Sequence, residues 1–228
     1  MIINRVKDLY GYNQRHIEAT YWQAKDEPSE KVGIVLPGYL YPSDGPATFY
    51  LKLLFMKYNW DYLTIDYRYN ENEEFLQSDD EAKKAYFEKE QGRIAQYIID
   101  TYRQKTVCLI GKSIGTTAIH TMCTDTELLE AVENISFILL TPTEVQSELV
   151  KAVSGAKKNL LFFIGNKDQY YDEKVIHEVH KKRNIEYQIV PNAGHLFEDK
   201  DNDTGQSIEN IKSITAFVEE HLSQGFLG

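Results

Sequence analysis

From residue 31 onward, short apolar segments of β character alternate with longer segments of helical periodicity. The segments expected to form strands are 31–38, 60–67, 106–111, 135–142, 159–165 and 185–195, the last including the loop after its strand. The expected helices are 48–58, 81–103, the stretch from the end of strand 106–111 to about residue 121, 171–183 and 207–222. This alternation is typical of an α/β fold, in which helices cover both faces of a mostly parallel sheet.

The N-terminal region adds strands of another kind. HIEATYWQAK, residues 16–25, alternates like an antiparallel strand, and residues 2–12 are a candidate for a further one, which brings the expected sheet to about eight strands. The sequence has no internal repeat, low-complexity segment or interdomain linker, so we expect a single domain over residues 1–228. Two acidic segments, 69–80 and 198–206, are expected to be solvated loops. In such a sheet the site lies in the loops that follow the strands.

The segment VCLIGKSIGTTA, residues 107–118, contains two overlapping motifs. GKS matches the end of a phosphate-binding P-loop, and GKSIG matches the G-x-S-x-G turn that presents a nucleophilic serine. A P-loop needs a glycine where this chain has Thr106, and the residues before Gly111 are stiff strand residues that cannot wrap a phosphate. GNKD at 165–168 resembles the base-reading motif of GTPases, but its Asp comes one residue early. Nucleotide binding is therefore disfavoured.

The serine motif fits its surroundings, because a buried strand precedes it and a helical segment follows it. A tight turn between them would hold Ser113 at a strained backbone angle and project its hydroxyl above the sheet. Gly111 and Gly115 would allow strand and helix to approach closely. We therefore expect Ser113 to be a nucleophile.

A serine nucleophile needs a base and an orienting carboxylate. Asp168 and His195 each follow a predicted strand, in the order that this reaction type requires, so we expect His195 to be the base and Asp168 to orient it. Asp168 could instead cap the helix near Tyr171, although Asp172 is the better cap candidate. None of the other five histidines follows the carboxyl end of a predicted strand.

Acyl transfer also needs two backbone N–H groups that stabilise the oxyanion. Ile114, directly after Ser113, would supply one, and Tyr39 in the loop PGYLYPSDGP would supply the other. Taken alone, Pro37-Gly38 would equally fit an ordinary turn.

These residues together resemble the α/β-hydrolase superfamily, over nearly the whole chain. GKSIG, GNKD and NAGH match the positions of the family's nucleophile, acid and histidine, and Asp66-Tyr67-Arg68 resembles the end of its fourth strand. Within the superfamily the chain is most similar to small, cap-less serine esterases of the dienelactone-hydrolase group. It departs from them in having Pro-Gly where the oxyanion loop commonly begins His-Gly. Dienelactone hydrolases typically use cysteine, so a serine favours esterase chemistry.

Several tyrosines accompany the predicted site. Only residues 141–158 separate two predicted strands where related hydrolases carry a cap, so we expect an open site unless residues 69–80 fold over it. An aromatic pocket would suit an acyl or aryl group. Its candidate residues are Tyr41, Tyr67, Tyr69, Tyr170 and Tyr171. The alternative is that these tyrosines pack loops onto the sheet.

The net charge of −10 argues against nucleic acid and anionic membranes as partners. The sequence has no signal-peptide pattern and no long apolar run, and Cys108 and Cys123 resemble buried thiols of a reducing compartment, so we expect a cytoplasmic protein. No His, Cys or carboxylate cluster has metal-ligand spacing, and we expect no cofactor. The oligomeric state is open.

Together these features predict a serine hydrolase acting on a small-molecule carboxylic ester, with thioesters also open, through an acyl-enzyme on Ser113. The alternatives are a small-amide or peptide hydrolase with the same triad and a non-catalytic binding protein with this fold. Lys112, beside the serine, has no role assigned by the sequence.

Overall fold

The structure, a computed structural model, describes residues 2–228 and is built on a sheet of eight strands. Across the sheet the strand order is β1-β2-β4-β3-β5-β6-β7-β8. The strands are β1 (Ile2–Arg5), β2 (Glu18–Gln23), β3 (Lys31–Leu36), β4 (Asp61–Asp66), β5 (Thr106–Lys112), β6 (Ile135–Leu140), β7 (Leu160–Gly165) and β8 (Ile185–Val190). β1 and β2 pair antiparallel, β2 pairs antiparallel with β4, and β3 to β8 are parallel. The expected mostly parallel sheet of about eight strands is confirmed.

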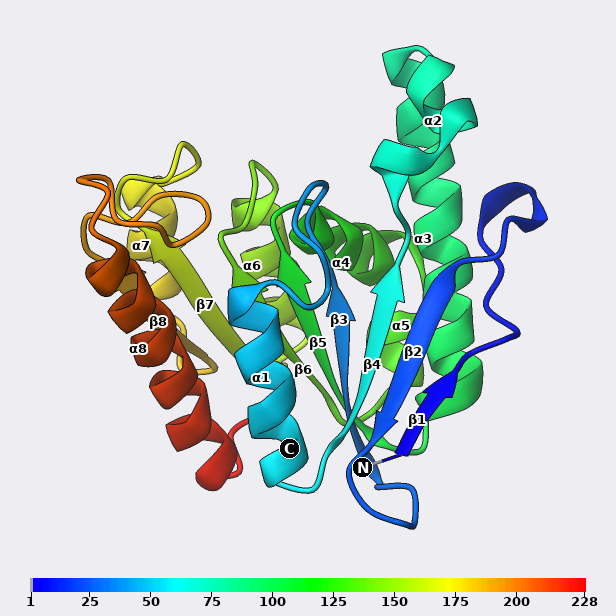
Figure 1. The fold of residues 1–228 in the computed structure, drawn as a ribbon, viewed down its shortest axis with the longest axis horizontal. Coiled ribbons are helices and arrows are strands. Elements are labelled where there is room, and N and C mark those ends of the chain that lie inside the picture. The colour runs from blue at the N-terminus through cyan, green and yellow to red at the C-terminus, as the bar shows by residue number, and fades with distance from the viewer. Residues whose placement is uncertain (1) are drawn as a thin grey trace.

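Helices cover both faces of the sheet, as predicted (Figure 1). One face carries α1 (Pro46–Lys57) and α8 (Thr204–Ser223). The other face carries α3 (Asp80–Tyr102), α4 (Ile114–Asp125), α5 (Leu128–Ala131), α6 (Gln146–Gly155) and α7 (Glu173–Val179). Each interface between sheet and helices is filled by its own cluster of buried apolar side chains. Between β6 and β7 lies only α6, so the expected absence of a cap at this point is confirmed.

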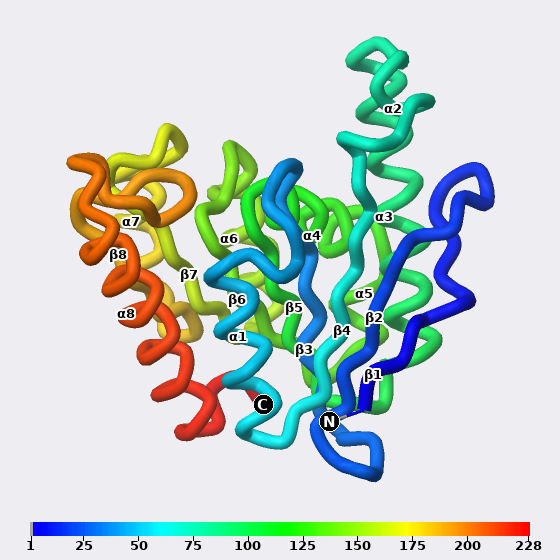
Figure 2. The backbone as a smooth tube through the Cα atoms, viewed as in Figure 1, coloured from blue at the N-terminus to red at the C-terminus, as the bar shows by residue number. Residues whose placement is uncertain are grey.

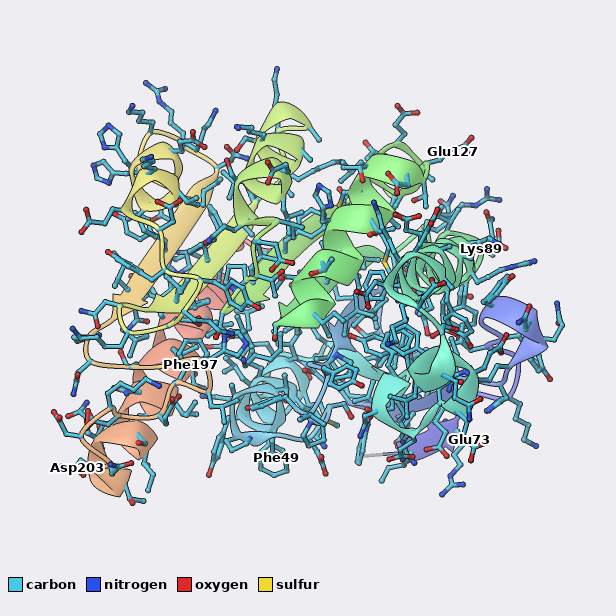
Figure 3. The ribbon with its side chains drawn as sticks, turned by 90° about the horizontal axis from the view of Figure 1, so that it is seen from above. Phe49, Glu73, Lys89, Glu127, Phe197 and Asp203 are labelled. Carbon is cyan, nitrogen blue, oxygen red and sulfur yellow. The ribbon has the colours of Figure 1, made fainter. Side chains whose placement is uncertain are left out.

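The loops that follow the parallel strands gather at one edge of the sheet, and the two chain ends lie at the opposite end (Figures 1 and 2). Because parallel strands all run in one direction, their carboxyl ends meet at this edge. Figure 3 looks down on it and shows Phe197, in the loop after β8, beside α8.

The prediction that residues 69–80 form a solvated loop is wrong. They form a 3₁₀ turn, η2 (Tyr69–Glu71), and a short helix, α2 (Glu73–Gln77), and they end at the start of α3. Asn72 caps α2 by accepting a hydrogen bond from the Phe75 backbone N–H at 3.2 Å. The acidic residues lie in the first turns of α2 and α3, where negative charge interacts favourably with the helix dipole. In the sequence, an acidic segment that contains two helix N-termini therefore resembles a solvated loop.

Two further findings concern the chain as a whole. Cys108 and Cys123 are both buried and form no disulfide, as the sequence predicts. Within residues 2–228, no helix combines the length and the apolarity needed to cross a membrane.

Candidate active site

Ser113 lies in the sharp turn between β5 and α4, with φ 54° and ψ −119°. This positive φ is costly for a residue with a side chain, and the surrounding structure must enforce it. Glycines on either side permit the turn. A Cβ atom on Gly115 would lie 2.0 Å from the carbonyl oxygen of Leu36, and one on Gly111 would lie 2.8 Å from that of Gly115. Strand and helix therefore approach as closely as the G-x-S-x-G motif predicts.

The structure brings Ser113, His195 and Asp168 together in one chain of hydrogen bonds. His195 Nε2 lies 2.8 Å from Ser113 Oγ, and His195 Nδ1 lies 2.9 Å from Asp168 Oδ2. A carboxylate can only accept, so Nδ1 donates to Asp168 and, in the neutral ring, Nε2 accepts from the serine hydroxyl. The Asp168 side chain has no exposed surface, whereas that of His195 is 25% exposed. The imidazole thus has a buried orienting partner on one side and an accessible hydroxyl on the other.

The backbone beyond β7 holds Asp168 in this position. Its second oxygen, Oδ1, accepts a hydrogen bond from the Tyr170 backbone N–H at 3.0 Å. Asp168 does not cap α7; that cap is Asp172, whose side chain accepts from the Lys174 backbone N–H at 2.8 Å. The sequence-based preference for Asp172 as the cap is confirmed.

The loops after β7 and β8 lie close enough for their side chains to meet. A Cβ atom on Gly165 would lie 2.1 Å from the carbonyl oxygen of Ala193, so only glycine fits at the end of β7. The Lys167 backbone N–H donates to the same Ala193 oxygen at 3.0 Å. These backbone contacts fix the spacing between Asp168 and His195 independently of the side chains.

The two backbone N–H groups predicted for an oxyanion hole belong to Tyr39 and Ile114. Within residues 2–228, neither group donates a hydrogen bond. Ile114 begins α4. The first N–H groups of a helix have no partner within the helix, and the helix dipole adds partial positive charge there, which favours a negatively charged oxygen. The loop of Tyr39 lies against the serine, since a Cβ atom on Gly38 would lie 3.5 Å from Ser113 Cβ. Both N–H groups remain available to a ligand.

The five tyrosines expected to line a pocket separate into two groups. Tyr67 and Tyr69 are each 1% exposed and stack on each other with ring centroids 4.7 Å apart. Both residues are among those that line a cavity, as predicted, although their rings are also buried in the core. The ring of Tyr69 packs against Phe75 of α2 and Phe87 of α3, and Tyr67 stacks on its other side. Tyr41, Tyr170 and Tyr171 are half-buried, and the Tyr170 ring lies 5.6 Å from that of His195.

Two cavities flank the loops of the site. One of about 690 Å³ lies beside the loop of Tyr39 and Tyr41, and its lining includes Trp22 and Lys52. The other, of about 950 Å³, lies between α1 and α8. Its lining is mostly apolar and includes Leu196, the residue after His195. Ser113 lines neither of these two cavities, and its side chain is partly exposed beside the loop of Gly38.

Lys112 had no role predicted from the sequence, and in the structure its ammonium group contacts the loops after β3, β6 and β8. Its Nζ donates to Thr141 Oγ1 and, at 2.8 Å, to the carbonyl oxygen of His195. The one signal in the sequence was a lysine at the end of an apolar strand. In the same region the Tyr67 hydroxyl donates to the carbonyl oxygen of Pro37, the residue before Gly38. Among residues 2–228, no group of three or more His, Cys, Asp or Glu side chains is arranged to hold a metal ion.

Comparison with known families decides the classification of the chain. A family model described as an alpha/beta hydrolase domain matches residues 45–223. The chain belongs to the α/β-hydrolase family. The match includes Ser113, Asp168 and His195, and the family's fold is the one that the sheet order and covering helices display. No curated protein matches the sequence of this α/β hydrolase.

Solved structures share the fold at low sequence identity. An esterase from Pyrococcus furiosus is 15% identical with a TM-score of 0.68, the match covering all of this chain (100%) and 93% of that one. The esterase domain of a Rhodothermus marinus protein is 11% identical with a TM-score of 0.63, covering 96% and 99%. A Xanthomonas campestris serine hydrolase without a lid is 12% identical with a TM-score of 0.62, covering 96% and 94%. At these identities the comparison concerns the fold alone.

Proposed function

We propose that this α/β hydrolase is a serine hydrolase of carboxylic esters that works through an acyl-enzyme on Ser113. The observation that carries the proposal is the continuous chain of hydrogen bonds from Asp168 through His195 to Ser113, at 2.9 and 2.8 Å. A protein that only binds a ligand has no need of a nucleophile, a base and a buried carboxylate in this arrangement.

In the proposed reaction, Ser113 Oγ attacks the ester carbonyl carbon while His195 Nε2 takes the hydroxyl proton. The carbonyl oxygen becomes an oxyanion, which the N–H groups of Tyr39 and Ile114 stabilise. His195 then gives the proton to the leaving alcohol, and the acyl group stays on Ser113. A water molecule, activated by the same imidazole, attacks the acyl-enzyme and releases the carboxylic acid. Asp168 keeps Nδ1 protonated, so that Nε2 is the free acceptor.

The surroundings of the triad favour small, largely neutral esters. The serine is partly exposed. The adjoining cavity is lined by three acidic side chains, Asp44, Asp66 and Glu71, against two basic ones, Lys52 and Arg68, and this excess of negative charge disfavours strongly anionic substrates. The names of the fold neighbours include two esterases, which supports ester chemistry for this chain as well. Thioesters and small amides remain the substrates to compare. We place the protein in the cytoplasm, acting without nucleic acid, membrane or cofactor.

Labelling with a fluorophosphonate probe tests the proposal, because such probes react covalently with activated serines. We expect the folded wild type to be labelled and Ser113→Ala to be unlabelled. Ser213→Ala is the matched control, since Ser213 lies on the exposed face of α8 and should leave labelling unchanged. Labelling that survives in Ser113→Ala, or a folded wild type that does not react, would refute the proposal.

A substrate panel then separates ester hydrolysis from its alternatives. We expect short-chain p-nitrophenyl esters to be hydrolysed faster than the matching thioesters and anilides. A labelled protein that prefers anilides would favour the amide-hydrolase alternative, and an unlabelled protein that binds esters without turnover would favour a binding role.

A further inference from the structure

Lys112 is a buried charged residue that the proposed mechanism does not use. It ends β5 directly before Ser113, and its side chain is fully buried, with an exposed fraction of 0%. Moving an ammonium group from water into a protein interior is costly unless hydrogen bonds and opposite charges compensate. Another long apolar side chain at this position would avoid that cost. The presence of a lysine at this buried position therefore indicates a role that an apolar side chain could not fill.

The contacts of the ammonium group join three separate loops. Its hydrogen bonds go to Thr141 Oγ1, in the loop after β6, and to the backbone carbonyl oxygen of His195, in the loop after β8. Its Nζ also lies 5.0 Å from the ring centroid of Tyr41, in the loop after β3, and 5.9 Å from that of Phe197. Aromatic ring faces attract a cation at such distances.

Two of these contact residues adopt backbone conformations that are rare outside glycine. Thr141 has φ 45° and Phe197 has φ 62°. Such conformations cost free energy and persist where neighbouring contacts enforce them. The lysine is hydrogen-bonded to one of these residues and faces the ring of the other, so it lies where both strained loops converge.

The charged groups around Lys112 explain how it keeps its charge. Burial lowers the pKa of its ammonium to about 8, and the carboxylates of Asp168 and Glu198 oppose that change. The other titratable groups in contact are Tyr41 and His195. At neutral pH the lysine therefore remains mainly protonated, with three N–H donors available.

We propose that Lys112 is a positioning residue that fixes the backbone of His195 relative to Ser113. This inference rests on the proposed function. The Asp168 carboxylate holds the imidazole ring, and the backbone bond from Lys167 to Ala193 spaces the loop after β8 from the loop after β7. Lys112 ties the loop after β8 to the nucleophile as well, because it is covalently next to Ser113 and hydrogen-bonded to the His195 carbonyl oxygen. Nucleophile and base are thereby linked through one side chain, which keeps Oγ and Nε2 at hydrogen-bond distance.

The test is Lys112→Met, which keeps the length of the side chain and removes both donors and charge. A displacement of about 1 Å in a catalytic group lowers rates by about 100-fold. We therefore expect kcat on a p-nitrophenyl ester to fall by about 30- to 100-fold, with KM changed by less than about threefold and the fluorophosphonate labelling rate reduced in proportion. The melting temperature should be unchanged or higher, since replacing a buried ion with an apolar side chain is often neutral or stabilising. Lys112→Gln retains an amide N–H donor, so its kcat should lie between that of the wild type and that of Lys112→Met.

Lys31→Met is the matched control. Lys31 also donates to a backbone carbonyl, that of Gly228 at 2.9 Å, and lies 5.4 Å from the Trp60 ring, but at the opposite end of β3. We expect this variant to keep its kcat.

The outcomes separate this proposal from the proposed function. A wild type that is not labelled refutes the hydrolase proposal itself. A labelled wild type with Lys112→Met equally active overturns the positioning role alone. If Lys112→Met does not fold, Thr141→Val decides, because it removes one acceptor of the ammonium and keeps the shape. A fall of about three- to tenfold in kcat at unchanged KM would support the role, and an unchanged kcat would overturn it.

Discussion

Two groups of side chains at the same edge of the sheet behave differently. Ser113, Asp168 and His195, after β5, β7 and β8, meet in direct hydrogen bonds and form an accessible site. Tyr67 and Tyr69, after β4, also follow a strand, but they turn into the core beneath α2 and α3. Position at a strand end is thus the same for both groups, and only one of them reaches the surface.

The difference lies in what each side chain can do when it is buried. An aromatic ring gains free energy from burial and can pack wherever neighbouring apolar surface exists. Tyr69 does so between Tyr67 and Phe75, with centroids 4.7 Å apart in each case, and its hydroxyl is satisfied by the Gln91 amide at 2.7 Å. A serine, a histidine and a carboxylate need specific polar partners, so their arrangement is more constrained. Polar residues in a fixed order at strand ends are the better guide to a site.

Asp168→Asn is the strongest test of whether the polar residues depend on specific hydrogen-bond partners. An amide at this position can hold the imidazole in the wrong tautomer, with Nδ1 unprotonated, so we expect kcat to fall by about 10⁴-fold with little change in stability. Ester turnover and thermal unfolding of the same preparation measure both.

Asp172→Asn is the control, because the Asp172 side chain caps α7, whereas the carboxylate bonded to the imidazole is that of Asp168. Asparagine also caps helices well, so activity and stability should both stay near those of the wild type. Full activity in Asp168→Asn would mean that another group orients His195.

The second test addresses the tyrosines. Tyr69→Ala should lower the free energy of unfolding by about 3–5 kcal/mol, the cost of removing a large buried aromatic side chain. Tyr170→Ala, at a half-buried ring 5.6 Å from that of His195, should cost less than about 1 kcal/mol but raise KM for aryl esters. Urea denaturation and ester kinetics distinguish the two. An unchanged stability in Tyr69→Ala would contradict its assignment to the core.

The third test measures how the stability of the fold depends on pH through Lys112, the buried lysine bonded to the backbone of His195. The pKa of Lys112 is lowered by burial from 10.5 to about 8, so between these two values the unfolded chain binds more protons than the folded one. The lysine therefore destabilises the fold at and below pH 8, and this cost fades as pH rises toward 10.5. The free energy of unfolding of the wild type should gain up to about 3 kcal/mol relative to Lys112→Met across this window. A constant difference between the two proteins, in urea denaturation at pH 8, 9 and 10, would mean that folding does not lower the pKa of Lys112.

Much of the fold was readable from the sequence because its signals are local. The segments that form β6 and β7 are uniformly apolar, which predicts strands buried by helices on both faces of the sheet. The alternation of apolar and polar residues in β2 predicted an antiparallel strand. The short helix α5 was not predicted, since four residues carry too little periodicity to be recognised. Residues 69–80 were misread because acidic side chains serve equally in solvated loops and at helix N-termini.

For the site, the sequence by itself predicted a nucleophile, a base and an orienting carboxylate in Ser113, His195 and Asp168, because their types and their order after strands are typical of that chemistry. Only the tertiary structure decided which side chains surround them. The sequence shows Lys112 only as a lysine at the end of an apolar strand, and it is the fold that brings three loops around its ammonium group. Likewise, Tyr67 is one of 16 tyrosines in the sequence, and only the fold stacks it on Tyr69 in the core. The physical reason is that hydrogen bonding and burial depend on residues distant in the sequence, and a local pattern carries no record of which of them will meet.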